Sequence, residues 1–227
     1  MKSILFILFF CQSWVVIEAQ KLKTYKVNPG KKITEVIPKD EIYLYPQFIR
    51  GIVFKRNDQF SEAPLNYNSL LGEMQFIDPD GDTLSIDDYE IISSIVIQED
   101  TFYYNKVCLK LVEDFGNVKL SSRLYIDFAN RQKIGGHGEL SSASLSTYSA
   151  VSSQIGSKEI SPYEILTLAK YQVFYISDKF NSFKIANKKN FFALFSKKEK
   201  TLQKYLSDKK VYFYSEKDLK ALINAFK

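Results

Sequence analysis

Histidine is almost missing from this sequence of 227 residues, since His137 is its only occurrence. A zinc site built from several histidines is therefore excluded. A Ser–His–Asp triad would have to use His137, and no Gly-x-Ser-x-Gly elbow is present to supply its serine. The glycines around His137 also lack the Gly-Lys-Ser/Thr continuation of a phosphate-binding loop. We interpret His137 as a loop residue and keep His137, Ser141 and Ser142 as candidate ligand-binding residues.

Cysteine is nearly as scarce, with Cys11 and Cys108 only. Cys11 belongs to an N-terminal segment with a short basic start, an apolar run and a small residue, Ala19, before a polar stretch. This pattern is typical of a secretory signal peptide, and we expect cleavage near Ala19. The apolar run is too short for an ordinary spanning helix. The bulky Phe10 before Cys11 disfavours a lipoprotein signal.

Cleavage of the signal would leave Cys108 as the only cysteine. No intramolecular disulfide could then form, so a hydrophobic core must hold the domain. Cys108 lies in the strand-like run Val107-Cys108-Leu109-Lys110-Leu111. We therefore expect it to be a small buried residue rather than a nucleophile.

Short runs rich in β-branched and aromatic residues occupy most of the first half of the chain. Several of them fall within residues 46–86, and further runs cover residues 89–97, 101–104, 106–112 and 118–128. Turn-forming residues separate them, and no long helical period intervenes. This spacing predicts an antiparallel sheet or an open barrel.

Three carboxylates alternate in the turn after residue 77, at Asp78, Asp80 and Asp82 around Gly81. Alternating acidic residues in a tight turn can converge on calcium. The twelfth position of a calcium loop counted from Asp78 should be a bidentate Glu, but Tyr89 stands there with Glu90 after it. A hairpin turn is the simpler interpretation, and calcium remains the alternative cofactor.

The second half of the chain changes character. Residues 135–160 are rich in Gly and Ser and predict a loop. Ser161-Pro162 predicts a short helical turn before Tyr171. A hairpin of residues 171–176 and 182–186 should follow, and then two amphipathic helices, from about Asn187 to Leu206 and after the cap Ser215.

Charge is uneven along the chain. From Lys188 to the end there are eleven lysines and four acidic residues, a net charge of +7, within a chain whose net charge is +5. Because the lysines fall on the polar faces of the predicted helices, a solvated basic face is the simplest interpretation. Contact with an acidic polymer or a membrane surface is the alternative.

The acidic residues are compatible with one class of enzyme, a hydrolase of glycans or peptides. A glycan or peptide hydrolase needs a pair of carboxylates at a defined separation, and nothing in their spacing here selects such a pair. The available residues are Asp87, Asp88, Glu90, Glu99 and Asp100.

Several segments together resemble small exported proteins of Bacteroidota that carry no assigned function. The segments are Ala19-Gln20, Gly51-Ile52-Val53-Phe54, Asn66-Tyr67-Asn68, Glu73-Met74-Gln75-Phe76, Gly81-Asp82-Thr83-Leu84 and the Lys-rich tail. The resemblance implies an envelope or secreted location and brings no catalytic residues.

The sequence therefore predicts an α+β protein, mainly an antiparallel β-sheet or open barrel with a C-terminal hairpin and two-helix unit. We expect a signal peptide at 1–19, a β-rich domain at 20–134, a loop at 135–160 and a C-terminal unit at 161–227. The expected function is a non-catalytic binding or structural role in the periplasm or outside the cell; a secreted hydrolase using a carboxylate pair or His137 is the alternative. The expected partner is an envelope protein or glycan, not a nucleic acid.

Overall fold

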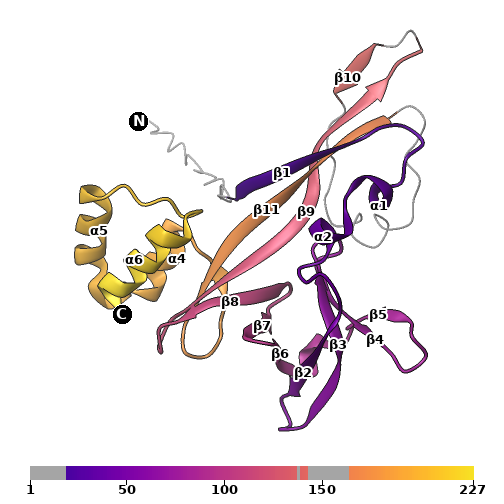
Figure 1. The fold of residues 1–227 in the computed structure, drawn as a ribbon. Helices are drawn as coiled ribbons and strands as arrows, with labels where there is room; N and C mark the ends of the chain where they lie inside the picture. The colour runs from indigo at the N-terminus through magenta and orange to yellow at the C-terminus, as the bar shows by residue number, and fades with distance from the viewer. Residues whose placement is uncertain (1–18, 137–138, 143–163) are drawn as a thin grey trace, which may run out of the picture.

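The computed structural model describes residues 19–136, 139–142 and 164–227. These residues form an open antiparallel sheet in the order β1-β11-β9-β8-β7-β6-β2-β3-β4-β5, with β10 paired to β9 and β12 to β11 (Figure 1). The predicted α+β class is confirmed, and the sheet does not close into a barrel. The strands are β1 (Gln20–Val27), β2 (Ile49–Lys55), β3 (Phe60–Asn68), β4 (Glu73–Ile77), β5 (Thr83–Ser85), β6 (Ile92–Ile97), β7 (Asp100–Tyr104), β8 (Cys108–Asp114), β9 (Lys119–Ile134), β10 (Leu140–Ser142), β11 (Glu164–Ser177) and β12 (Lys184–Ile185).

Two long strands, β9 and β11, form the spine of the molecule (Figure 1). They pair from Lys133 opposite Glu164 to Lys119 opposite Ser177. Ser161-Pro162, which predicted a short helical turn before Tyr171, lies outside the described residues, but from Glu164 onward the chain is strand β11 and not helix. β11 is hydrogen-bonded to β1 on one side and to β9 on the other, so sheet pairing overrides the local helix-start signal. The predicted hairpin exists as the short pairing of β11 with β12.

Two short helices cover one end of this spine. They are α1 (Ile33–Val36) and α2 (Lys39–Ile42), which follow β1 in the chain. Their apolar side chains form a core with residues of β1, β9 and β11. The buried members are Tyr25, Val27, Ile33, Ile37, Ile42, Leu70, Ile126, Leu166 and Leu168.

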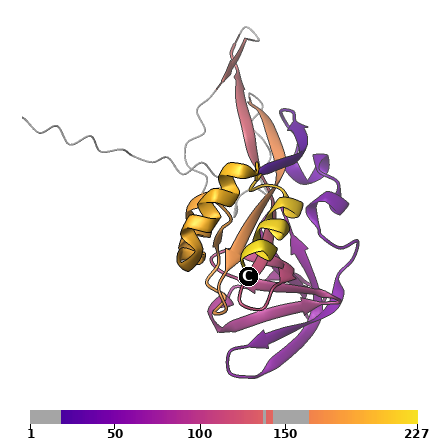
Figure 2. The same cartoon turned by 90° about the vertical axis from the view of Figure 1, so that its left-hand side faces the viewer.

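The other end of the spine is covered by the C-terminal helices α4 (Lys188–Leu194), α5 (Glu199–Asp208) and α6 (Glu216–Phe226), as Figure 2 shows. The helix predicted from Asn187 to Leu206 is divided, because Phe195 leaves the helical conformation and a 3₁₀ turn follows at Ser196–Lys198. Ser215 caps α6 as predicted, since its side chain accepts a hydrogen bond from the backbone of Asp218. Leu120 and Phe174 of the sheet share a core with these helices.

The remaining strands, β2 to β8, curl away from the spine and enclose a third core (Figure 1). Gly51 makes the close strand packing possible, because a Cβ there would lie 2.7 Å from the carbonyl oxygen of Val96 and 2.8 Å from Leu65 Cδ1. The 3₁₀ turn η1 (Tyr89–Ile91) leads from β5 back to β6 and completes the curl. No helix among the described residues is long and apolar enough to cross a membrane.

Candidate ligand-binding groove

The curled strands enclose an apolar hollow of about 730 Å³ that is open to solvent. It lies among β2, β3, β4 and the segment that runs from β5 through η1 to β6. A volume of this size falls within the range of about 300–1,000 Å³ that small-ligand sites occupy. Its apolar lining includes Val53, Ala63, Leu65, Phe76, Ile86 and Ile91.

The groove is an open continuation of the core of the curled strands. Val53, Leu65 and Ile92 line the groove and also belong to that core. At the surface, Ile91 is 46% exposed and Leu84, which pairs with Phe76, is 44% exposed. Exposed apolar side chains beside an apolar hollow are typical of a binding surface.

Hydrogen bonds fix one wall of the groove, the segment that follows β5. The Tyr89 hydroxyl accepts a hydrogen bond of 3.1 Å from the backbone N–H of Met74. The Ile86 N–H donates to the carbonyl oxygen of Met74 at 3.0 Å. Tyr89 also stacks on Tyr104 with ring centroids 3.8 Å apart. The segment after β5 is therefore attached to β4, so the hollow is preformed.

The lining carries four carboxylates, Glu62, Asp78, Asp87 and Asp88, against the single lysine Lys55. Glu62 is already paired, because Arg50 Nε donates to it at 2.7 Å. Asp87 and Asp88 are exposed, and neither carboxylate has a hydrogen bond or ion pair within the described part of the chain. The lining is therefore apolar within a negatively charged surround, which favours a cationic ligand group.

The predicted turn at Asp78, Asp80 and Asp82 lies beside this groove, with Asp78 in its lining. Asp78 Oδ1 accepts hydrogen bonds from the backbone N–H groups of Asp80 at 3.0 Å and Asp82 at 2.8 Å. Gly81 has a φ of +90°, which explains the glycine there. One oxygen of Asp78 thus holds the hairpin turn. Within the described residues, no group of three or more His, Cys, Asp or Glu side chains is placed to hold a metal ion.

The other candidate residues are not brought together with the groove. His137 lies outside the described residues. Ser141 and Ser142 belong to β10, where they pair with Lys133 and Gln132 of β9. Cys108 is buried as predicted, and its burial raises the pKa of the thiol to about 12, so the thiolate is disfavoured.

Asp100, one of the carboxylates proposed for hydrolysis, lies outside the groove in a separate polar cleft. The Tyr45 hydroxyl donates to it at 2.6 Å, and Lys110 Nζ lies 2.8 Å away. These contacts give Asp100 a structural role, since its carboxylate is held by Tyr45 and Lys110.

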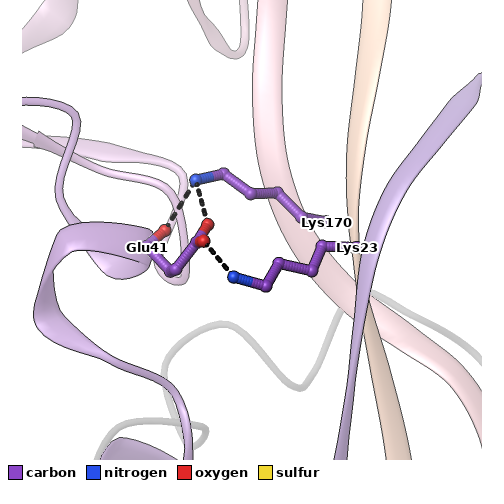
Figure 3. A network of polar contacts seen from close by, with 3 residues as sticks. All are labelled: Lys23, Glu41 and Lys170. Atoms are coloured by element: carbon purple, nitrogen blue, oxygen red, sulfur yellow. Dashed lines mark hydrogen bonds and ion pairs between the residues drawn. The ribbon is translucent and has the colours of Figure 1, made fainter.

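The most elaborate polar contact anchors α2 to the sheet (Figure 3). Glu41 Oε1 lies 2.5 Å from Lys23 Nζ of β1, and Oε2 lies 3.1 Å from Lys170 Nζ of β11. Lys170 Nζ also donates to the carbonyl oxygen of Glu41 at 2.9 Å. The hydrogen bond from Lys23, reinforced by Lys170, lowers the pKa of Glu41 to about 2 despite partial burial. Both lysines are used for structure.

Comparison with known proteins gives no further assignment, since no family model, no curated protein and no solved structure matches this chain. The groove itself was not predicted from the sequence. Its lining comes from five separate segments between residues 53 and 92, and only their juxtaposition by the curled sheet creates the site.

Proposed function

We propose that this chain is an exported, non-catalytic binding protein of the bacterial envelope, and that its groove binds an apolar group carrying a positive charge. The observation that carries the proposal is an apolar hollow of about 730 Å³ whose lining bears four carboxylates and one lysine. Export is supported by the signal-peptide pattern of residues 1–19.

The apolar lining supplies the affinity. Each methylene group moved from water into such a site contributes about 0.8 kcal/mol. Six buried methylene groups would therefore contribute roughly 5 kcal/mol, part of which offsets the entropy lost on association. Because hydrogen bonds hold the groove wall, little further ordering is needed when a ligand enters.

The unpaired carboxylates supply the selectivity. A charge pair about 4 Å apart in a watery environment contributes about 1 kcal/mol. Asp87 and Asp88 have no counter-ion among the described residues, so a ligand cation gains attraction without displacing an existing partner. A ligand anion of the same shape is repelled.

Three of the reactive groups are already held in structural positions, which supports a binding role. Cys108 is buried, Asp100 is held by Tyr45 and Lys110, and Glu41 is held by two lysines. The natural ligand that fits is an apolar peptide segment flanked by Lys or Arg, presented by another envelope protein.

Calorimetric titration with decyltrimethylammonium and with decanoate, both below their micelle-forming concentrations, tests this proposal. We expect the cation to bind about tenfold more tightly than the anion, which corresponds to about 1.4 kcal/mol. Equal affinity for the two probes would contradict the role of Asp87 and Asp88, and no heat from either probe would contradict the groove itself.

Two matched variants locate the binding. Ala63→Trp fills the hollow and should abolish probe binding. Phe60→Trp adds the same indole to the same strand, but Phe60 is 63% exposed and does not line the groove, so binding should persist. Retained binding in Ala63→Trp would place the probe elsewhere.

A further inference from the structure

We infer that the connection between α5 and α6, residues 209–214, is a docking surface for anionic lipid headgroups. We call this segment the tyrosine ledge. It ends in a turn at Phe213 and Tyr214, and along residues 211–214 partly buried side chains alternate with exposed ones. Phe213 packs on Phe191 with ring centroids 5.7 Å apart, whereas Tyr212 and Tyr214 are 37% and 38% exposed. The inference does not depend on the groove.

The ledge is held in a fixed conformation. The Tyr212 N–H donates to Asp218 Oδ2 at 3.0 Å, and the Ser215 N–H donates to the carbonyl oxygen of Tyr212 at 2.9 Å. The rings of Tyr212 and Tyr214 consequently lie close together, with centroids 5.3 Å apart. Two aromatic rings are thus presented to solvent without a further ordering cost on binding.

Two lysine ammonium groups lie over tyrosine rings in and beside the ledge. Lys210 Nζ lies 4.8 Å from the ring centroid of Tyr212, and Lys209 Nζ lies 4.7 Å from that of Tyr205. Both lysines are exposed. Neither lysine forms an ion pair with an acidic side chain of the described residues, whereas Glu216 pairs with Lys220 at 2.9 Å.

The whole C-terminal unit is basic, with eleven lysines and four acidic residues from Lys188 onward. Lys220 is the lysine of this stretch that forms ion pairs within the described residues. Each lysine near an anionic membrane surface contributes about 1 kcal/mol of attraction. Tyrosine rings, apolar along the body and polar at the tip, are enriched where a membrane meets water.

The exposed tyrosine rings favour a membrane over a soluble polyanion. Tyr212 and Tyr214 are 37% and 38% exposed, and a soluble polyanion needs only the lysine charges. Aromatic rings with a polar tip gain from the interface between lipid and water as well.

Co-sedimentation with vesicles of phosphatidylcholine, with and without 30% phosphatidylglycerol, tests the inference on the exported protein. We expect binding to the anionic vesicles only, weakened about tenfold or more in the double variant Lys209→Gln/Lys210→Gln. The matched control Lys31→Gln/Lys39→Gln removes two exposed lysines near α1 and α2 and should bind like the parent. Equal weakening in both double variants would mean that net charge alone matters and would overturn the ledge.

A second readout reports the tyrosines directly. The only tryptophan of the sequence is Trp14, within the expected signal peptide, so Tyr214→Trp carries the only tryptophan of the cleaved chain. We expect its emission to shift to shorter wavelength with anionic vesicles and to be quenched by brominated lipid. An unchanged spectrum would overturn the inference. So would binding to polygalacturonate without binding to vesicles, which would identify an acidic glycan instead.

Discussion

Glu41 provides the sharpest test of how the fold is held. Replacing Glu41 with Gln keeps the shape of the side chain but removes the charge that faces Lys23 and Lys170 (Figure 3). The two lysines differ in environment, since the side chain of Lys170 is 12% exposed and that of Lys23 is 55% exposed. Loss of the charge therefore leaves a largely buried ammonium group beside a neutral amide.

The expected loss of stability follows from this difference in exposure between the two lysines. Because Lys23 is exposed and its ion pair is screened by water, Lys23→Gln should lower the free energy of unfolding much less than Glu41→Gln does. A hydrogen bond to a charged group that is mostly shielded from water contributes about 1.5–3 kcal/mol. We expect Glu41→Gln to lower the free energy of unfolding by roughly 2 kcal/mol. Urea denaturation at pH 7 measures both variants on the same scale.

The pH dependence supplies an independent check. The pKa of Glu41 is about 2 in the folded protein, below the value of about 4.5 for a free side chain. Its contribution is therefore fully present above about pH 4.5 and is lost as the pH falls toward 2. The stability difference between parent and Glu41→Gln should shrink across this window. Equal losses in Lys23→Gln and Glu41→Gln at pH 7, or a difference that does not change with pH, would refute this reasoning.

Two further predictions concern the curled strands. Gly51→Ala should lower the free energy of unfolding by about 1–3 kcal/mol in urea denaturation, because the added Cβ would lie 2.7 Å from the backbone oxygen of Val96. Gly136→Ala is the control, because a Cβ there meets nothing within 4 Å. Equal effects of the two substitutions would contradict the close packing at Gly51. Cys108 should not react with Ellman's reagent in the folded protein at pH 8 and should react fully in urea, because burial raises the pKa of its thiol to about 12; rapid reaction of the folded protein would contradict that burial.

Much of the fold was predictable because local sequence patterns determine it. Short apolar runs between turn residues predicted the antiparallel sheet, and the apolar face around Leu219 and Leu222 predicted the last helix, capped by Ser215. The failures arose where distant segments decide the outcome. Leu166 to Lys170 became strand because β1 and β9 both pair with it, and no local signal at Pro162 reports those neighbours.

The groove was harder to predict for a related reason. The acidic turn at Asp78 was identified from the sequence, but the apolar surface beside it comes from strands that meet only through the curl of the sheet. Ala63 and Ile91 carry no sequence signature of a binding residue. They form part of a site only because they line the same hollow, and the linear sequence does not show that they lie close together.

The central claim is that this groove binds an apolar, positively charged ligand, and methyl NMR of isoleucine-labelled protein during titration with decyltrimethylammonium tests it most directly. We predict that the methyl signals of Ile86 and Ile91 shift in proportion to occupancy, because both side chains line the groove. The signal of Ile223, buried in the helical core, should stay in place. Shifts confined to Ile223, or no shift at Ile86 and Ile91 at saturating probe, would contradict the claim.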